Sequence, residues 1–427
     1  MAGPAIRALE LGKCLSRHFA TTVASPVKTD TKPENLPAEL NLVTGFSRKE
    51  LTELALATET IFIQANVLKP YPFLAKLGKY LIVDLYDPYL FSVLVQYKDD
   101  PVQASSSYRL MHQILEKHML AADFTVCASE RQRDYWLGRF CALGRINPSL
   151  YNFDPSLRKL LDVVPYGLPE AAPCKCAAFP TLRERLKIGE NDPVLLWGGG
   201  IWDWFDPLTP ISAVSKLVSK IPNLRLVFMG TKSPNPKVPV MDMTVRAREL
   251  SDSLALTDKN VFFLDGWVDY DERVNYLLDA DIAISSHFDL PETRFSFRTR
   301  ILDYFWCGLP ILTTHGDGLA DLIQENGAGL ALPYEDVDAW SAAIEQLVLK
   351  KELRQSMKAG STKLSSRFHW QDNARPILEF LQAPYHLPDY EKVTMPSLLE
   401  RAHAVYRRGG QELILKRSKE LLGDILK

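Results

Sequence analysis

Residues 296–312 read SFRTRILDYFWCGLPIL, a polar and basic loop that runs into a short helix and then into a strand. The apolar residues of this helix recur at a helical period and share one face, which contains Ile301, Leu302, Phe305 and Trp306. Arg300 and Asp303 fall on the opposite face. We therefore expect this acid and this base to lie together, away from the core.

The start of the helix has the chemistry of a diphosphate site. Free backbone N–H groups and the positive end of a helix dipole suit a phosphate, and we expect them in the loop formed by Ser296, Phe297, Arg298 and Thr299. One turn further in, the carboxylate of Asp303 can accept hydrogen bonds from a ribose. A second interpretation stays open, in which Arg300 and Asp303 form an ordinary i, i+3 ion pair on an exposed helix.

The composition is that of a globular protein with two to three domains. The chain has 427 residues, of which 46% are hydrophobic and 24% are charged, and its formal net charge is -2. This balance gives no sign of polyanion binding, so we expect no nucleic-acid partner. The longest apolar-looking stretch, residues 81–95, is interrupted by Asp84, Asp87 and Pro88 and falls short of the ~20 residues that span a bilayer.

The cysteines favour a reduced, cytosolic protein. All six are scattered, and Cys174 and Cys176 lack the paired spacing of a zinc site. The cysteines therefore predict no zinc site. No other metal-ligand cluster is visible in the sequence, and we expect no metal and no cofactor.

Strand-like runs such as residues 60–64, 80–84 and 282–285 alternate with helical ones, which predicts parallel, doubly wound sheets. A stretch rich in proline, alanine and cysteine at residues 168–183 separates two series of such runs. We expect two Rossmann-like domains, residues 1–172 and 173–383, that face one another across a cleft. Residues 384–427 form a helical, basic tail, for which packing on a domain, membrane contact and partner contact stay open.

The N-terminal residues have two interpretations. Residues 1–29 carry four basic residues and one acidic residue, as a mitochondrial transit peptide would. We favour a structural origin, with an amphipathic helix over residues 6–19 and a strand over residues 21–26. The loop at Gly3 then leads into a helix without a preceding strand, so we expect the first strand of the N-terminal domain to be missing.

Glycines end several strands of the second domain. The first of these strands runs into Gly199 and Gly200, where the backbone can approach a phosphate closely. Gly230 ends another strand, and a nucleoside can lie against this sheet edge with Trp267 or Val268 near its base. Simple turns are the alternative in each case.

Two carboxylates flank the predicted cleft. Glu292 lies just before the phosphate loop, close enough in sequence to reach a transferred group, and a salt bridge with Arg294 or Arg298 is the alternative. Asp87 ends a strand of the first domain, where it can orient an acceptor hydroxyl. Helix capping is its alternative.

Both halves of the chain resemble the family-4 retaining glycosyltransferases, which adopt the GT-B fold. The second half resembles their donor domain in the segments GLPI at 308–311, DGWV at 265–268 and ADIAIS at 280–285. The first half resembles their acceptor domain in GPAIR at 3–7 and VVPYGLP at 163–169. The resemblance covers nearly all of residues 1–382, and it implies a nucleotide-sugar donor, no obligatory metal and transfer with retained anomeric configuration.

Two features depart from the family pattern. Such enzymes carry two glutamates separated by seven residues, but here Asp303 stands at the second position and Phe295 at the first. We expect Glu292, three residues earlier, to take the place of the first glutamate. The Arg and Lys that follow the first donor-domain glycine loop in the family are absent, so Arg298 and Arg300 are expected to supply the cations for the diphosphate.

These features predict a hexosyltransferase that moves a sugar from a nucleotide-diphosphate sugar to a hydroxyl of a glycan or lipid-linked acceptor. Glu292, Arg298 and Asp87 are the expected catalytic residues, and Gly3 and Arg7 are expected to face the acceptor. We expect the protein in the cytoplasm, with membrane contact at the inner face through its basic tail. Two alternatives stay open: another GT-B enzyme, such as a nucleotide-sugar epimerase or a sugar phosphorylase, and a non-catalytic GT-B scaffold.

Overall fold

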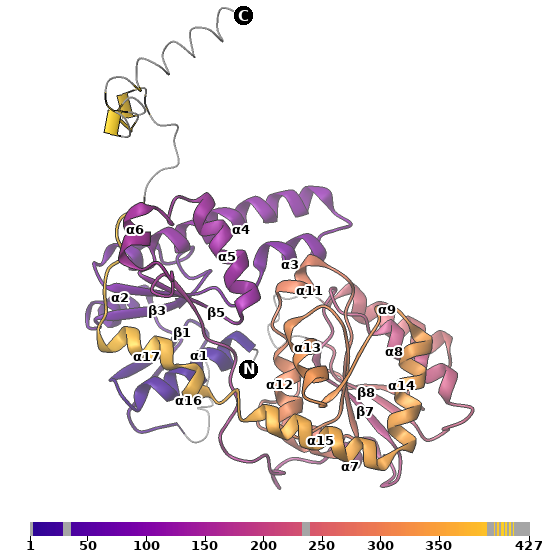
Figure 1. Cartoon of the computed structure of the whole chain (residues 1–427). Helices are drawn as coiled ribbons and strands as arrows, with labels where there is room; N and C mark the ends of the chain where they lie inside the picture. Colours follow the sequence, from indigo (N-terminus) through magenta and orange to yellow (C-terminus); the bar gives the residue numbers. More distant parts are fainter. Residues whose placement is uncertain are drawn as a thin grey trace, which may run out of the picture.

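The computed structural model describes residues 3–28, 36–232 and 240–390, together with residues 397, 399, 400, 403, 404, 406, 407, 410 and 413. The described chain forms two α/β lobes that lie side by side (Figure 1). Both lobes are built on parallel sheets whose strands alternate with helices. The predicted α/β fold class is therefore confirmed.

The N-terminal lobe contains two separate parallel sheets. One has four strands in the order β3-β4-β5-β6, and the other pairs β1 with β2. The strands are β1 (Thr21–Ser25), β2 (Leu40–Thr44), β3 (Thr60–Gln64), β4 (Tyr80–Asp84), β5 (Phe124–Cys127) and β6 (Leu161–Val163). The helices are α1 (Gly3–Ser16), α2 (Arg48–Leu56), the 3-10 helix η1 (Pro72–Lys76), α3 (Tyr89–Gln96), α4 (Pro101–Ala121), α5 (Glu130–Ala142) and α6 (Pro148–Phe153).

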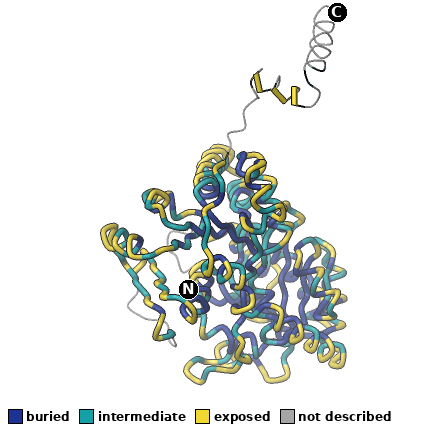
Figure 2. Tube along the Cα trace, turned by 60° about the vertical axis from the view of Figure 1, so that its left-hand side comes forward, coloured by how far each residue is buried: buried dark blue, intermediate teal, exposed yellow. Residues whose placement is uncertain are grey.

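The inner strands of the larger sheet are buried between layers of helices. Four of the five residues of β4 and all four residues of β5 are buried, as expected for parallel strands that are covered on both faces. Figure 2 shows buried residues concentrated inside each lobe and exposed residues on the outer helices. The carboxyl ends of these strands therefore become the part of the sheet that can present side chains to a ligand.

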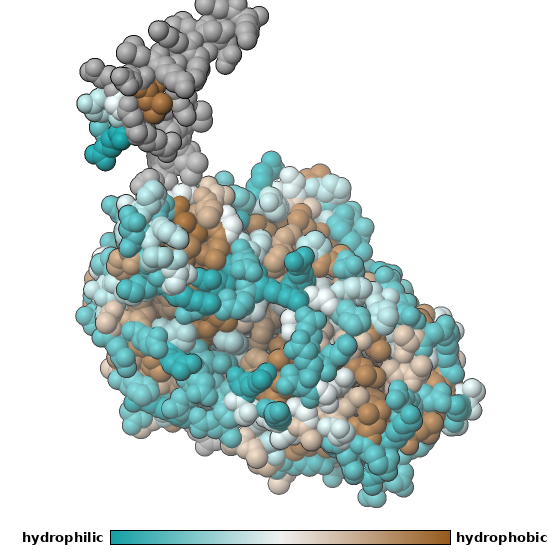
Figure 3. All heavy atoms as spheres, in the orientation of Figure 1, coloured by the Kyte–Doolittle hydropathy of each residue, from teal (hydrophilic) through white to brown (hydrophobic). Residues whose placement is uncertain are grey.

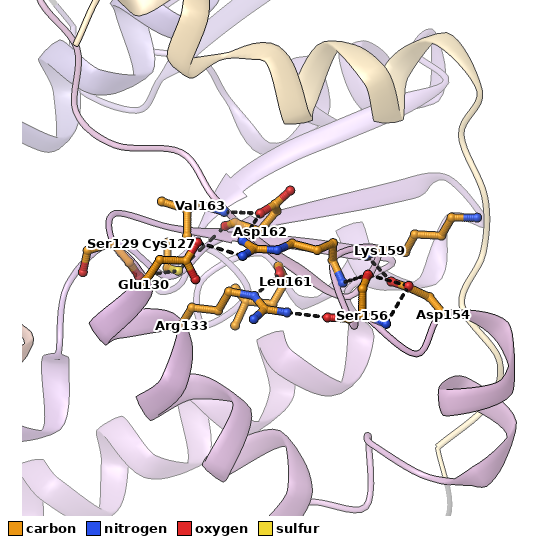
Figure 4. Close-up of polar contacts among 11 residues, drawn as sticks. Cys127, Ser129, Glu130, Arg133, Asp154, Ser156, Lys159, Leu161, Asp162 and Val163 are labelled. Atoms are coloured by element: carbon orange, nitrogen blue, oxygen red, sulfur yellow. Dashed lines mark hydrogen bonds and ion pairs between the residues drawn. The ribbon is translucent and has the colours of Figure 1, made fainter. Parts of the chain in front are cut away.

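A polar network ties β6 and the loop before it to the start of α5 (Figure 4). Arg158 pairs with Asp162 at 2.6 Å and with Glu130 at 2.8 Å. Arg133 of α5 donates hydrogen bonds to two backbone carbonyls of the segment 156–161. The network fixes α5, and this helix carries residues that reach the second lobe.

The C-terminal lobe contains one six-stranded parallel sheet in the order β12-β11-β10-β7-β8-β9. Its strands are β7 (Val194–Gly200), β8 (Arg225–Gly230), β9 (Val261–Phe263), β10 (Ile282–Ser285), β11 (Ile311–Thr314) and β12 (Gly329–Leu332). Its helices are α7 (Leu182–Leu186), α8 (Leu208–Leu217), α9 (Asp242–Ser253), α10 (Arg273–Asp279), α11 (Pro291–Phe295), α12 (Thr299–Trp306), α13 (Gly318–Glu325), α14 (Val337–Leu349) and α15 (Lys351–Ser365). The strand order reverses between β7 and β10, and open α/β sheets bind ligands outside the carboxyl ends of the strands at such a switch point.

The last two helices, α16 (Trp370–Asn373) and α17 (Arg375–Gln382), return to the first lobe. The ring of Phe380 stacks on that of Phe124 in β5 with centroids 5.2 Å apart, and Trp370 packs against Tyr166. These helices fall in the range 173–383 that the sequence assigned to one domain, yet they contact the first sheet. The predicted boundaries stay a prediction.

The predicted tail at residues 384–427 lies mostly outside the described residues, so its packing, membrane or partner contacts stay predictions. In the part of the chain that the structure describes, no helix combines the length and the hydrophobicity that crossing a bilayer requires.

Candidate functional site

Unpartnered polar atoms gather at the carboxyl ends of the second sheet. Among the described residues, ten buried side-chain nitrogen or oxygen atoms have no hydrogen-bond partner, and six of them belong to this region. The six residues are Asp206, Ser285, His287, Arg298, Arg300 and Asp317. Such atoms are rare in folded proteins because each costs free energy. Their concentration at the switch point between β7 and β10 therefore indicates a binding site.

The glycine run at the end of β7 turns the backbone at this point. Gly199 has a φ of +87°, a left-handed conformation that favours glycine. The N–H of Gly198 donates to the hydroxyl of Tyr304 at 2.7 Å, and a Cβ on Gly198 would lie only 3.0 Å from the same ring. The predicted glycine turn is thus held against α12, the helix that follows the predicted phosphate loop.

Two indole rings lie beside Gly200. The position of a Cβ on this residue is 3.5 Å from Trp202 and 3.8 Å from Trp267. Gly230 pairs with Gly200 across the two neighbouring strands. Val268, the other residue predicted near a base, is buried in the apolar core. Of the two candidates for a base platform, Trp267 is therefore the one that lies by the glycine turn.

Arg300 does not point away from the core, so this expectation was wrong. It donates to the carbonyl of Gly200 at 2.6 Å, and its guanidinium carbon lies 4.1 Å from the ring centroid of Phe205 and 4.7 Å from that of Trp197. The helical period identified the apolar face of α12 correctly, but the end of β7 and the loop after it cover part of the other face. Burial lowers the pKa of Arg300 to about 10, and the positive charge of Arg298 adds to this shift.

Asp303 pairs with Arg273 of α10, and the alternative i, i+3 ion pair with Arg300 does not form. The Nε of Arg273 lies 3.2 Å from Oδ1 of Asp303, and the guanidinium carbon lies 3.5 Å from the ring centroid of Tyr270. Burial alone would lower the pKa of Arg273, but the charge and hydrogen bond of Asp303, together with the nearby tyrosines, outweigh burial, and the pKa is raised. Oδ2 of Asp303 has no hydrogen-bond partner among the described residues, so it can accept one from a ligand.

Glu292 and Arg298 form a buried two-point ion pair. Nη2 lies 2.7 Å from Oε2 and Nη1 lies 3.2 Å from Oε1. The hydroxyl of Ser296 also donates to Oε1 of Glu292. The salt bridge that was the alternative for Glu292 is therefore present, and contact of Glu292 with a sugar stays a prediction. Nε of Arg298 has no partner.

The helix α12 begins directly after this ion pair. Its N-cap residue is Arg298, and no side chain caps the helix. The first amides of an α-helix have no partner within the helix. The N–H groups of Thr299 and Arg300 therefore remain available to an anion, as the predicted phosphate loop requires.

His287 and Asp317 belong to the site, although sequence reasoning missed both. Nε2 of His287 and Oδ2 of Asp317 lie 3.9 Å apart, and both side chains are almost completely buried. Oδ1 of Asp317 accepts from two backbone N–H groups at the start of α13. Burial, together with the positive charge of Arg298, lowers the pKa of His287 well below its ordinary value. A helix-cap pattern was the only signal for Asp317, and nothing in the sequence marked His287.

Asp87 is the residue that the first lobe contributes to the candidate site. Burial raises its pKa to about 7, the charges of Asp84 and Glu292 add to this rise, and two arginines, one of them Arg298, oppose it. The carboxylate of Asp87 has no hydrogen-bond partner in the described chain. The N-cap of α3 is Pro88, with no side-chain cap, so the helix-capping alternative for Asp87 does not hold.

Arg7 is a structural link inside the first lobe. Its guanidinium donates to both carboxylate oxygens of Asp84, at 2.7 Å and 3.2 Å, and to the carbonyls of Val164 and Pro165. Gly3 lies at the start of α1, and apart from its chain neighbours and the backbone of its own helix no atom lies within 4 Å of its Cβ position. The acceptor role of both residues stays a prediction, and the guanidinium of Arg7 is already occupied by four hydrogen bonds.

Aromatic residues join the two lobes beside the site. The hydroxyl of Tyr86 donates to the carbonyl of Phe297 at 3.3 Å. The ring of Phe295 stacks on Phe91 of α3 with centroids 5.7 Å apart. Phe295 stands where the resembled family has its first glutamate, and here it is part of the contact between lobes.

A second contact between the lobes reaches the loop that carries Asp317. Arg131 of α5 donates to the carbonyl of Gly316 at 2.7 Å and pairs with Asp321 of α13 at 2.6 Å. The first lobe therefore holds the backbone next to a buried acid of the second lobe.

Within the described ranges, no three His, Cys, Asp or Glu side chains gather in a way that could hold a metal ion. The expected independence of metals and cofactors stays a prediction.

The second lobe matches a known family model. Residues 192–350 match the model described as Glycosyl transferases group 1. The chain is also similar to the D-inositol 3-phosphate glycosyltransferases of Saccharomonospora viridis (25% identity over 199 residues, 46% of this chain and 44% of the relative) and Xylanimonas cellulosilytica (25% over 236 residues, 53% and 52%). The chain thus spans about half the length of these curated relatives.

The fold as a whole is similar to three solved structures. Anabaena HepE in complex with UDP-glucose has a TM-score of 0.64 at 12% identity, covering 90% of this chain and 96% of that chain. Sucrose-phosphate synthase from Thermosynechococcus elongatus has a TM-score of 0.61 at 16% identity, covering 89% and 93%. WaaG, a glycosyltransferase involved in lipopolysaccharide biosynthesis, has a TM-score of 0.59 at 16% identity, covering 90% and 97%. The predicted GT-B fold is confirmed.

Proposed function

We propose that this chain is a glycosyltransferase that moves a sugar from a nucleotide-diphosphate sugar to a hydroxyl group of an acceptor. The proposal is carried by the cluster of buried, unpartnered polar atoms at the switch point, which includes atoms of Arg298 and Arg300. In the described chain, Arg300 has no acid within ion-pair distance. A buried guanidinium without an acid favours an anionic ligand. The cluster also lies within the range that matches the group 1 glycosyl transferases.

The donor would lie between the glycine turn and the start of α12. Its diphosphate would meet the free N–H groups of α12 and the charges of Arg298 and Arg300, and Oδ2 of Asp303 would accept a ribose hydroxyl. The rings of Trp202 and Trp267, which lie beside Gly200, would contact the base. Negative charge grows on the diphosphate as its bond to the sugar breaks, so the two arginines would lower the barrier by stabilising that charge.

Transfer would join the acceptor oxygen to the anomeric carbon. The bond from that carbon to the β-phosphate oxygen breaks, and its electron pair leaves with the nucleoside diphosphate. The acceptor hydroxyl must also lose its proton. Asp87, whose pKa of about 7 lies near neutral pH, is the group that would accept it.

The proposal extends to the stereochemistry of the transfer and to the donor. Retention of the anomeric configuration rests on the resemblance of both halves to the retaining family. A hexose donor on UDP is the first to test, since HepE is similar in fold and its structure contains UDP-glucose. An epimerase, a phosphorylase or a scaffold is not favoured, because the family that matches residues 192–350 consists of glycosyl transferases.

A thermal-shift screen with UDP-, GDP-, TDP- and ADP-sugars tests donor binding. A ligand present at about 100 times its Kd stabilises the native state by about 2.7 kcal/mol, which raises the melting temperature by several degrees. We expect the melting temperature to rise with nucleotide sugars of one base. The protein should then slowly release the nucleoside diphosphate from that nucleotide sugar. The Arg300→Gln variant is compared with the wild type and should show a much smaller rise of the melting temperature. The proposal fails if no nucleotide sugar in the panel raises the melting temperature or is turned over.

A further inference from the structure

A cavity of about 240 Å³ lies in the first lobe between α3, α4 and α5. It is lined by Leu90, Phe91, Leu94, Tyr108, Tyr135 and Arg139. A cavity of ~150 Å³ holds benzene, and sites for larger ligands start near ~300 Å³. The cavity therefore suits a ring or a short branched chain and is too small for a nucleotide sugar.

The cavity adjoins the candidate site. Asp87 lies two residues before α3. Leu94, the last cavity residue on this helix, comes seven residues after Asp87, and seven residues of helix correspond to about 10 Å. Phe91 and Tyr135 line the cavity, and both contact Phe295, with ring centroids 5.7 Å and 5.1 Å apart. Phe295 ends α11, the helix that carries Glu292. One wall of the cavity is thus the aromatic contact that joins the lobes beside the site.

Three polar groups of the cavity lack a hydrogen-bond partner. The hydroxyls of Tyr108 and Tyr135 have no partner in the described part of the chain, and neither has Nε of Arg139. Nη2 of Arg139 donates to the carbonyl of His112 at 2.9 Å, and no described acid lies within ion-pair distance of this arginine. A cation and two hydroxyls in apolar surroundings favour an anionic oxygen group, such as a phosphate.

Apolar side chains are also exposed on α3 and α4. Leu94, which lines the cavity, is 45% exposed, Leu110 is 44% exposed and Val102 is 80% exposed. Figure 3 shows hydrophobic residues at the surface in the region of α3 and α4. Arg139 lies one helical turn beyond Tyr135 on α5, about 6 Å further along the helix.

We propose that the acceptor is a sugar joined through a phosphate group to an apolar chain, with its phosphate at Arg139 and the start of its chain in the cavity. This inference rests on the proposed function, because it places the sugar hydroxyl at Asp87. The positive charge of Arg139 and the two hydroxyls favour the phosphate, the aliphatic and aromatic walls favour the chain, and the shared wall with Phe295 connects both to the site.

Isothermal calorimetry on the full chain tests the cavity with geranyl phosphate as the probe. Geraniol and inorganic phosphate serve as the two half-ligands. We expect geranyl phosphate to bind at least about tenfold more tightly than either half, since it combines apolar burial with the charge pair. Equal affinity for geraniol and geranyl phosphate would overturn the role of Arg139.

Leu94→Asp is the decisive variant, because Leu94 is exposed and its replacement leaves the core intact. We expect about tenfold weaker binding of geranyl phosphate and unchanged binding of the nucleotide sugar. Val245→Asp is the matched control, since Val245 is 43% exposed on the other lobe, and it should change neither affinity. Unchanged binding of geranyl phosphate by Leu94→Asp would overturn the proposal.

The two proposals fail in different ways. If geranyl phosphate binds as expected while no nucleotide sugar binds or turns over, the glycosyltransferase assignment fails and the cavity assignment stands as a ligand site. If a nucleotide sugar turns over but geranyl phosphate does not bind, the acceptor class is wrong. Sedimentation with phosphatidylcholine–phosphatidylglycerol vesicles adds a third result. Vesicle binding that Leu94→Asp abolishes, without any binding of geranyl phosphate, would make this face a membrane surface instead.

Discussion

Glu292 and Arg298 hold one another through two hydrogen bonds, of 2.7 Å and 3.2 Å, with side chains only 2% and 5% exposed. The pair connects α11 with the N-cap of α12, where the diphosphate is proposed to bind. Each charge compensates the other in a place that water hardly reaches. The pair is therefore part of the framework of the site, in addition to any contact with a ligand.

Loss of one partner should destabilise the protein more than loss of both. Glu292→Gln or Arg298→Met alone leaves an uncompensated buried group, which lowers the free energy of unfolding by about 3–5 kcal/mol. The double variant should lose clearly less than the sum of the two single losses. Urea unfolding of the four proteins measures this coupling. Additive losses would show that the two side chains do not depend on one another.

Replacement of Asp303 by Asn should weaken nucleotide binding by about tenfold. The change removes the charged acceptor for the ribose and leaves the positive charge of Arg273 unpaired. Calorimetry with the nucleoside diphosphate measures the affinity. Asp281→Asn is the control, since Asp281 pairs with Arg183 at the same 3.2 Å outside the site. If both variants weaken binding equally, Asp303 has no specific part in it.

Asp87 should make the stability of the protein depend on pH in an unusual direction. Its pKa in the folded state, about 7, lies above the ordinary value of 3.8. The folded state therefore holds this proton more tightly than the unfolded state, and the stabilisation, complete below about pH 4, is lost as the pH rises through 7. Asp87→Asn should melt a few degrees higher than the wild type at pH 8, with the difference shrinking toward pH 5. The same difference at both pH values would contradict the raised pKa. Activity should also fall strongly in this variant.

Arg131 should affect donor affinity from the opposite lobe. Its ion pair with Asp321 is largely exposed, so Arg131→Gln should change the free energy of unfolding by less than about 1 kcal/mol. Its bond to Gly316 holds the loop of Asp317, however, and its loss should raise the donor KM several-fold. Arg158→Gln removes a comparable exposed arginine that pairs only within the first lobe. An equal change of KM in both variants would argue against coupling between the lobes.

Local patterns predicted the positions of several strands. Residues 60–64, 80–84 and 282–285 coincide with β3, β4 and β10, because buried parallel strands require continuous apolar or β-branched residues. The pattern did not reveal β2 at Leu40–Thr44, a short strand with only one fully buried residue. Whether such a half-exposed segment becomes a strand depends on the hydrogen bonds that a neighbouring strand offers, and periodicity does not contain that information.

By itself, the sequence determined the two α/β halves, the apolar face of α12 and the glycine turn at the end of β7. These features follow from periodicity and backbone freedom, which act over a few residues. Tertiary structure alone decided the partners of the charged residues, Arg300 with the carbonyl of Gly200 and Asp303 with Arg273, and the raised pKa of Asp87. It also decided the burial of His287 with Asp317. The reason is physical: pairing and pKa depend on distance and on exclusion of water, and both are set by segments that lie far apart in the chain.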